Sequence, residues 1–144
     1  MEDCIFCKII NGNIPSYKIH ETADFVSILD INPNVKGTTL VISKKHHASN
    51  PMEIPNEILK KGIIAAKEIS KILSSKLNVE RVGMAIDGTG VNHFHIKLYP
   101  FHKGESGLGE AHERVYFEHY PGYLTTQLGP QEDFSELEKL AKSF

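Results

Sequence analysis

The chain has 144 residues and a formal net charge of -2 at pH 7. A chain of this length is expected to fold as one domain, residues 1–144, around a single core. The weak charge excludes a general attraction for nucleic acid, whose phosphates are bound by many lysines and arginines. The N-terminus lacks the pattern of a secretory signal and no apolar stretch is long enough to cross a bilayer. We therefore expect a cytoplasmic protein with no nucleic acid and no membrane among its partners.

Short strands dominate the first third of the chain. A short helix over residues 6–12 precedes them, because Gly12 is a residue suited to a helix C-terminus. A turn rich in Asn, Pro and Gly occupies residues 31–37. The strands predicted here are residues 17–22, 25–31 and 38–45.

One long amphipathic helix is predicted over residues 55–77, where apolar residues recur at helical spacing and most lysines lie elsewhere. Two further strands, residues 81–87 and 93–99, are expected on either side of a tight Gly-Thr-Gly turn. The order of elements predicts an α+β fold with an antiparallel sheet and segregated helices. The last predicted elements are a strand over residues 114–120 and a short helix over residues 130–144, capped near Asp133 or Ser135.

The stretch HFHIK alternates polar and apolar side chains, which is the period of a strand with one buried face. His93, His95 and Lys97 would then point the same way, with successive side chains about 6.5 Å apart. At that separation they are able to hold one small anionic group together. The alternative is that His95 is only a residue on a half-buried strand face.

Cys4 and Cys7 have the C-x-x-C spacing of half a tetrahedral zinc site. In a reducing compartment, two close thiols are more often a metal or redox pair than a structural disulfide. A thioredoxin-like pair is disfavoured because the strand expected before it and the long helix expected after it are absent. Two buried cysteines that pack as small hydrophobic residues are the other alternative.

Three stretches in order, CIFCKIINGNIPSYKIHE, ILDINPNVKGTTLVISKKHH and VNHFHIKL, resemble the histidine triad (HIT) family of nucleotide hydrolases and transferases. The resemblance implies a nucleotide as substrate and a homodimer whose sheet is continuous across both copies. In the family the middle histidine attacks the α-phosphorus of a nucleotide and forms a covalent nucleotidyl-imidazole intermediate. By this resemblance the nucleophile is His95.

The third triad position is Lys97 in place of a histidine. A protonated amine holds phosphate oxygens well but gives up its proton reluctantly, which favours charge stabilisation over general-acid work. The substitution resembles a superfamily branch, including galactose-1-phosphate uridylyltransferase, whose third position is also not histidine. It weighs against simple phosphoramidate hydrolysis more than against nucleotidyl transfer. The alternative is that Lys97 is a strand-end residue that reaches solvent.

The resemblance also implies a structural zinc ion. In zinc-bearing relatives, the histidine after a basic pair and the first triad position complete a Cys2His2 site. His47 is the disfavoured alternative to His46, because neighbouring strand residues point to opposite faces. The implied ligands are Cys4, Cys7, His46 and His93.

A nucleotide pocket is implied in the same way. Asp30 matches the acid that accepts hydrogen bonds from the ribose hydroxyls. Asp87 matches the polar residue before the glycine loop, where a carboxylate repels phosphate unless it is turned away, protonated or bridged. Gly88 and Gly90 allow a backbone anion nest, with a plain hairpin turn as the alternative. The residues matching the slot for the base, each with core packing as its alternative role, are Phe6, Ile9, Leu29, Ile31 and Leu40.

The predicted protein is a zinc-stabilised HIT-type enzyme that hydrolyses or transfers at the α-phosphate of a nucleoside phosphate derivative. Dinucleoside polyphosphates and nucleoside phosphoramidates are the candidate substrates, and His95 and Lys97 the catalytic residues. The alternative is a nucleotide-binding or zinc-stabilised interaction module without effective turnover. The last third of the chain has no recognisable motif, and its candidates to reach the pocket or a partner subunit are His112, His119 and Tyr120.

Overall fold

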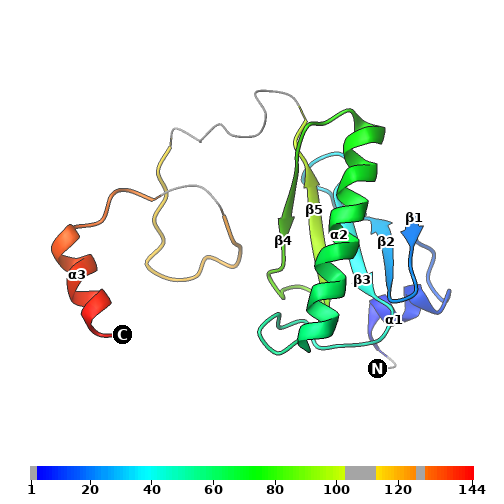
Figure 1. Ribbon diagram of the computed structural model, residues 1–144, viewed down its shortest axis with the longest axis horizontal. Helices are drawn as coiled ribbons and strands as arrows, with labels where there is room; N and C mark the ends of the chain where they lie inside the picture. The colour runs from blue at the N-terminus through cyan, green and yellow to red at the C-terminus, as the bar shows by residue number, and fades with distance from the viewer. Residues whose placement is uncertain (1–2, 103–112, 126–128) are drawn as a thin grey trace. The chain divides into compact units, whose positions relative to one another are not determined.

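The structure, a computed structural model, describes residues 3–102, 113–125 and 129–144. The chain divides into two compact units, Met1–Gly107 and Leu108–Phe144, and the first of these carries the sheet (Figure 1). The expectation of a single domain over residues 1–144 stays a prediction. The elements of the first unit are α1 (Ile5–Ile10), β1 (Lys18–Glu21), β2 (Phe25–Leu29), β3 (Thr39–Ser43), α2 (Asn56–Leu77), β4 (Val82–Ala85) and β5 (His95–Pro100).

The five strands form one sheet in the order β1-β2-β3-β5-β4, and every pair of neighbours is antiparallel. The predicted α+β fold with an antiparallel sheet is therefore confirmed. β5 lies between β3 and β4, where His95 is opposite Ile42 of β3 and Lys97 is opposite Ala85 of β4. The strand with the polar alternation thus runs through the interior of the sheet.

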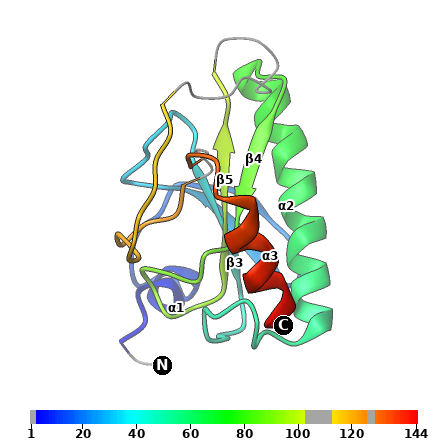
Figure 2. The same cartoon turned by 90° about the vertical axis from the view of Figure 1, so that its left-hand side faces the viewer.

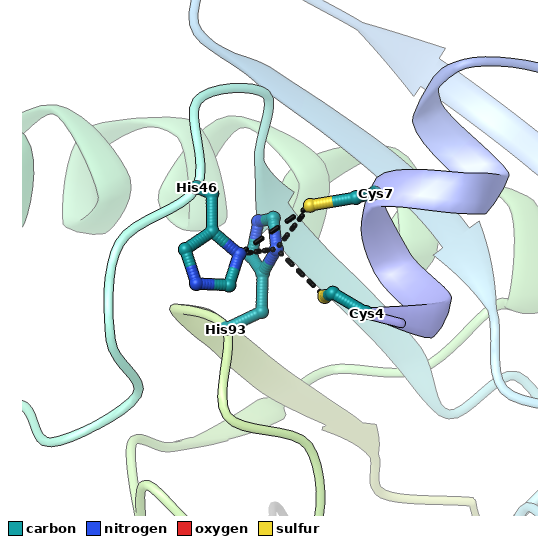
Figure 3. Close-up of side chains that lie close together, drawn as sticks. All are labelled: Cys4, Cys7, His46 and His93. Carbon is teal, nitrogen blue, oxygen red and sulfur yellow. Dashed lines mark hydrogen bonds between the residues drawn. The ribbon is translucent and has the colours of Figure 1, made fainter. Parts of the chain in front are cut away.

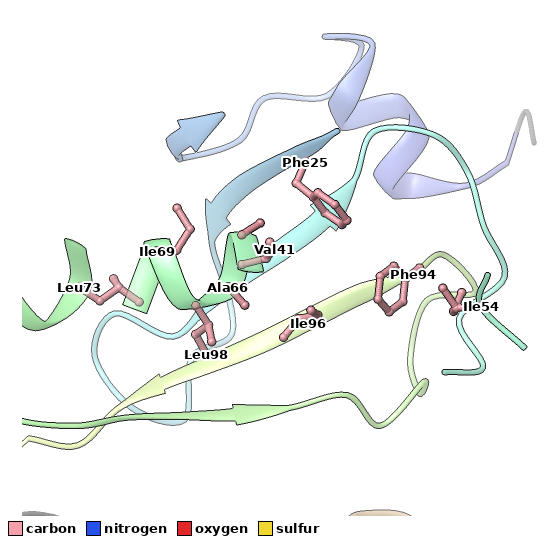
Figure 4. Close-up of a cluster of buried hydrophobic side chains, with 10 residues drawn as sticks. Phe25, Val41, Ile54, Ala66, Ile69, Leu73, Phe94, Ile96 and Leu98 are labelled. Carbon is pink, nitrogen blue, oxygen red and sulfur yellow. The ribbon is translucent and has the colours of Figure 1, made fainter. Parts of the chain in front are cut away.

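Helices cover both faces of this sheet. Figure 2 shows α2 on one side of the strands and α1 on the other. Alternation along β5 places Ile96 and Leu98, both fully buried, in the core beneath α2 (Figure 4). Burial of such a side chain contributes about 1.5–3 kcal/mol. Beneath α1 a second cluster forms from Phe6, Val26, Ile28, Leu40 and Ile42.

Gly62 lets α2 approach the sheet closely. A Cβ atom at this position would lie 3.1 Å from the Phe94 ring and 3.3 Å from both Ile96 and Phe25. Contacts this short are tighter than most that a real Cβ makes, so any side chain here would push against the buried core. The apolar periodicity of the helix does not reveal this position.

Several predicted boundaries need correction. β3 ends at Ser43 and β5 begins at His95, so His46, His47 and His93 lie in the segments next to the strands. The prediction of a tight hairpin turn is wrong, because the connection between β4 and β5 is longer and comprises residues 86–94. The strand predicted over residues 114–120 is also wrong, since the structure shows that segment without strand pairing.

The second unit contains α3 (Phe134–Lys142). The Asp133 carboxylate caps it by accepting hydrogen bonds from the backbone N–H groups of Ser135 and Glu136, at 2.7 and 3.3 Å, which confirms the predicted cap. His119 and Tyr120 are exposed, whereas His112 lies outside the described residues. Among the described helices of both units, none is long and apolar enough to cross a membrane.

Candidate functional site

Four predicted metal ligands from three separate segments come together in the first unit. Cys4 and Cys7 lie at the start of α1, His46 follows β3 and His93 precedes β5 (Figure 3). The Nδ1 atom of His93 lies 3.4 Å from Cys4 Sγ, 3.6 Å from Cys7 Sγ and 3.2 Å from His46 Nδ1. All four ligand atoms are within 4.8 Å of one another.

The spacing of these atoms fits a tetrahedral zinc ion. With Zn–S near 2.3 Å and Zn–N near 2.0–2.1 Å, a tetrahedral site separates its ligand atoms by about 3.3–3.8 Å. The three nitrogen-to-sulfur distances, 3.4–3.6 Å, lie in that range, and the 3.2 Å between the two Nδ1 atoms lies just below it. Two thiols and two imidazoles are the donor set of structural zinc sites. All four ligand atoms lie within 4.8 Å of one another, so the four side chains are close enough to hold the ion together.

His93 is fixed in the orientation that a ligand requires. Its ring is fully buried, and its Nε2 atom lies 2.7 Å from the carbonyl oxygen of Ser43. Burial lowers the pKa of His93, which favours the neutral ring. Because Nε2–H donates to the carbonyl, Nδ1 carries the lone pair that faces the cluster.

His47 lies apart from this cluster. It lines a small cavity together with Asp24, Phe25 and Ser43, none of which belongs to the predicted nucleotide site. Its Nε2 atom is buried, without a hydrogen-bond partner among the described residues. The choice of His46 over His47 agrees with the geometry, but the predicted reason does not hold because both residues follow the strand.

His95 is held by its own strand. Its Nδ1 atom lies 2.7 Å from the carbonyl oxygen of His93, so Nδ1–H donates there and Nε2 keeps the lone pair. The side chain is almost entirely buried, and the Phe6 ring packs edge-on against it with centroids 5.2 Å apart. Burial lowers the pKa of His95. The ring is therefore an uncharged imidazole with a fixed tautomer, as a nucleophile at neutral pH requires.

Lys97 forms an ion pair with Asp87. Its Nζ atom lies 3.3 Å from Asp87 Oδ2, and the two side chains are only 24% and 16% exposed. The hydroxyl and backbone N–H of Thr89 donate to the same carboxylate, at 3.0 and 3.3 Å. Burial raises the pKa of Asp87, but the Thr89 hydrogen bonds and the Lys97 charge together lower it overall. The Asp87 carboxylate is thus ionised and paired with the Lys97 ammonium. Bridging by a cation is one of the three ways named above in which a carboxylate here would not repel phosphate.

Ser49, which lies outside the loop between β4 and β5, holds that loop through hydrogen bonds. Ser49 donates its backbone N–H to Asn92 Oδ1 at 3.0 Å and its hydroxyl to the carbonyl of Gly88 at 2.7 Å. Gly88 and Gly90 have φ values of +69° and +82°, the left-handed region that favours glycine. A Cβ on Gly88 would lie 2.9 Å from the Ser49 carbonyl oxygen, whereas one on Gly90 would meet nothing within 4 Å. Sequence reasoning missed Ser49, because nothing in a lone serine signals a distant loop contact.

The residues predicted to bind the nucleotide differ in how they are buried. Phe6, Ile9 and Leu40 belong to or pack against the apolar cluster beneath α1. Asp30 follows β2, where its Oδ1 accepts a hydrogen bond from the backbone N–H of Asn32 at 2.8 Å. Leu29 is half-buried at the end of β2, whereas Ile31 is 74% exposed; their part in a slot for the base stays a prediction.

Tyr99 extends the polar face of β5 beyond the triad. It is two residues after Lys97 on an alternating strand, and it is half-buried. Burial raises the pKa of Tyr99, while the nearby charge of Lys97 opposes that shift and those of Asp87 and Asp30 add to it. The alternation that places His95 and Lys97 on one face of the strand also predicts Tyr99 on that face.

Comparisons with known proteins identify the class to which this fold and site belong. A family model described as the HIT domain matches residues 11–103, more than half of the 144-residue chain. The chain therefore belongs to the HIT family, and the prediction from its motifs is confirmed. It is 36% identical over 115 residues to a Candida albicans protein named adenosine 5'-monophosphoramidase, with 74% of this chain and 75% of that protein covered.

Solved structures agree with the fold. A member of the HIT family from Bacillus subtilis is 29% identical, with a TM-score of 0.66 over 98% of this chain and 94% of that one. A Zn-bound histidine triad family protein from Mycobacterium smegmatis has a TM-score of 0.67 and 22% identity, with 99% of both chains covered. At that identity the second likeness shows the shared fold alone.

Proposed function

We propose that this chain is a nucleotide hydrolase or nucleotidyltransferase that acts at the α-phosphate of a nucleoside phosphate derivative. His95 is its nucleophile, and the reaction passes through a covalent nucleotidyl-histidine intermediate. The observation that carries the proposal is the hydrogen bond from His95 Nδ1 to the His93 carbonyl, which leaves Nε2 free to attack phosphorus. The monophosphoramidase name of the Candida albicans relative supports the same class of chemistry.

The cleavage divides into two displacements. The Nε2 lone pair of His95 forms a bond to the α-phosphorus as the bond to the leaving group breaks. Water or another acceptor then attacks the same phosphorus, and the electron pair of the N–P bond returns to Nε2. While the ring carries the nucleotide its charge is positive, and the carbonyl of His93, 2.7 Å from Nδ1, stabilises that charge.

The other predicted residues hold the nucleotide. Asp30 accepts hydrogen bonds from the ribose hydroxyls, and the apolar cluster containing Phe6 and Leu40 packs against the base. Lys97 stabilises charge on the phosphates, and Asp87 holds the Lys97 ammonium in position through their ion pair. The loop containing Gly90 offers backbone N–H groups to the anion.

Zinc is proposed as a structural ion held by Cys4, Cys7, His46 and His93. The support is the donor set and its tetrahedral spacing. The ion, when bound, ties the start of α1 to the segment before β5. All four positions are protein ligands, so the site leaves no place for a reacting water.

A homodimer is proposed as the working assembly. β4 pairs with β5 and has no second partner strand among the described residues, and an edge strand offers backbone groups for pairing with another copy. Met84 on this edge is 43% exposed. The cytoplasmic location is likewise retained as a proposal.

A search for the covalent adduct tests the proposed function. The protein is mixed with a dinucleoside polyphosphate or a nucleoside phosphoramidate, quenched without acid, and examined by intact mass. We expect the mass of one nucleotidyl group on the wild type and on the control His20→Ala, and none on His95→Ala. Turnover by the wild type no faster than by His95→Ala would remove the enzyme claim. Nucleotide binding without adduct or turnover would favour the binding module instead.

A further inference from the structure

We propose that Lys97, positioned by Asp87, makes this chain select substrates whose leaving group is an anionic phosphate joined through a phosphoanhydride bond. Substrates with an amine leaving group are processed poorly. This inference rests on the proposed function, because it concerns the group that departs when His95 attacks. It narrows the substrate class to nucleoside phosphoanhydrides, such as dinucleoside polyphosphates.

The position of Lys97 carries the first step. Residues 95 and 97 lie on the same face of β5, and alternate side chains on a strand stand about 6.5 Å apart. Lys97 is directly opposite Ala85 of β4 and Leu40 of β3, in the interior of the sheet. Its side chain is mostly buried. It is therefore a fixed cation beside the nucleophile, which argues against a strand-end lysine that merely reaches solvent.

The ion pair leaves Lys97 able to bind a substrate anion. An ammonium group has three donors, and Asp87 Oδ2 accepts one of them at 3.3 Å. The Thr89 hydroxyl holds that same carboxylate oxygen at 3.0 Å. Within the described residues the Lys97 ammonium donates to no other acceptor, so two of its donors stay available for phosphate oxygens while Asp87 limits where the ammonium can move. Asp87 is thus a positioning residue that acts through Lys97.

Cleavage of a phosphoanhydride suits this arrangement. His95 Nε2 forms the N–P bond, the P–O bond breaks, and its electron pair stays on the departing oxygen. The product is a phosphate or nucleoside phosphate anion, which needs no proton to depart. Its developing charge is stabilised by the Lys97 ammonium, whose side chain is 24% exposed.

Cleavage of a phosphoramidate places a different demand on the site. When the P–N bond breaks, the electron pair goes to nitrogen, which must receive a proton to leave as a neutral amine. A histidine supplies that proton readily near neutral pH, since its ordinary pKa is about 6.5. Lysine is a poorer proton donor than histidine at that pH, because its ordinary pKa is about 10.4. This chain is therefore expected to differ in preference from its relative named adenosine 5'-monophosphoramidase.

Two substrates that deliver the same adenylyl group to His95 test the proposal. We would measure kcat/KM of the full chain with diadenosine tetraphosphate and with adenosine 5'-phosphoramidate. Wild type is expected to favour the anhydride by about a hundredfold or more, the lower range of what a missing general acid costs. Lys97→His should raise kcat/KM for the phosphoramidate by about tenfold and lower it for the anhydride. The phosphoramidate activity of Lys97→His should also decline as pH rises through about 6.5.

The Asp87→Asn variant tests the positioning role. It should lower kcat for both substrates, and by about tenfold more for the anhydride than for the phosphoramidate. A role in folding alone would lower kcat for both substrates by the same factor. Lys71→His, the same replacement on the exposed side of α2, is the matched control and should change neither substrate.

The outcomes separate this inference from the function beneath it. If neither substrate gives an adduct or turnover, the proposed function fails and this inference fails with it. If the wild type forms the His95 adduct from both substrates with equal kcat/KM, or favours the phosphoramidate, only the selection by Lys97 is overturned. A preference for the anhydride that survives Lys97→His would also overturn it.

Discussion

The Nδ1 atom of His95 lies 2.7 Å from the carbonyl oxygen of His93. The ring of His93 makes the complementary choice, because its Nε2 atom lies 2.7 Å from the carbonyl oxygen of Ser43. Two histidines separated by one residue therefore hold their protons on different nitrogens. One ring directs Nδ1 at the cysteine cluster, and the other has the lone pair on Nε2.

The first prediction is that these opposite tautomers exist in solution. Long-range proton–nitrogen correlation spectra of the full chain, recorded at neutral pH with zinc present, should show Nε2–H on His93 and Nδ1–H on His95. The physical reason is that each carbonyl accepts a hydrogen bond only from a protonated nitrogen. The same tautomer for both rings would contradict the assignment of roles.

The second prediction concerns the metal. His46→Ala should remove most of the bound zinc and lower Tm, because it deletes one of four ligands whose binding energy is coupled to folding. His47→Ala is the matched control and should keep the ion, since that ring lies apart from the cluster and lines a separate cavity. Elemental analysis and thermal unfolding with and without chelator measure both effects. Equal loss of zinc in the two variants would argue against the ligand set.

The antiparallel sheet and the apolar core could be predicted from the sequence because both depend on local patterns of polar and apolar residues. Period-two alternation identifies Ile96 and Leu98 as core residues whatever the exact end of the strand. Its limit is at boundaries, where His93 was expected on β5 but precedes it. A strand ends where backbone pairing ends, and pairing depends on partners that are distant in the sequence.

The Asp87–Lys97 ion pair shows why the remaining part of the site could not be predicted. The two residues are ten positions apart, and their contact at 3.3 Å requires the register of β4 against β5. The sequence alone shows only that an acidic residue, Asp87, stands where the family binds phosphate. That Lys97 neutralises this carboxylate follows only from the pairing of β4 with β5. Ser49 is a similar case, since its bond to Gly88 spans 39 positions.

The third prediction concerns the packing of α2. Gly62→Ala should lower the free energy of unfolding by about 1 kcal/mol, because overpacking costs about 2 kcal/mol and exceeds the gain of about 1 kcal/mol in helix propensity. The crowded neighbours are the Phe94 ring and Ile96, at 3.1 and 3.3 Å from the new Cβ. Urea unfolding measures the difference. Ser75→Ala, exposed on the same helix, is the control and should be neutral or slightly stabilising. A more stable Gly62→Ala would show that the helix is free to shift.

The fourth prediction is a pH dependence that arises at Glu21. Hydrogen bonds from Lys18 and then Lys44, at 2.6 and 2.7 Å, lower the pKa of Glu21 from 4.5 to about 2. A carboxyl group whose pKa is lower in the folded state stabilises that state above its unfolded pKa, and this contribution disappears as pH falls through the folded value. The difference in unfolding free energy between wild type and Glu21→Gln should therefore be constant above about pH 5.5 and shrink between about pH 4.5 and pH 2. Both ion pairs are open to solvent, with the Glu21 side chain 43% exposed, so added salt should reduce the difference. Parallel pH profiles for the two proteins across that window would show that the lysines do not hold this carboxylate in solution.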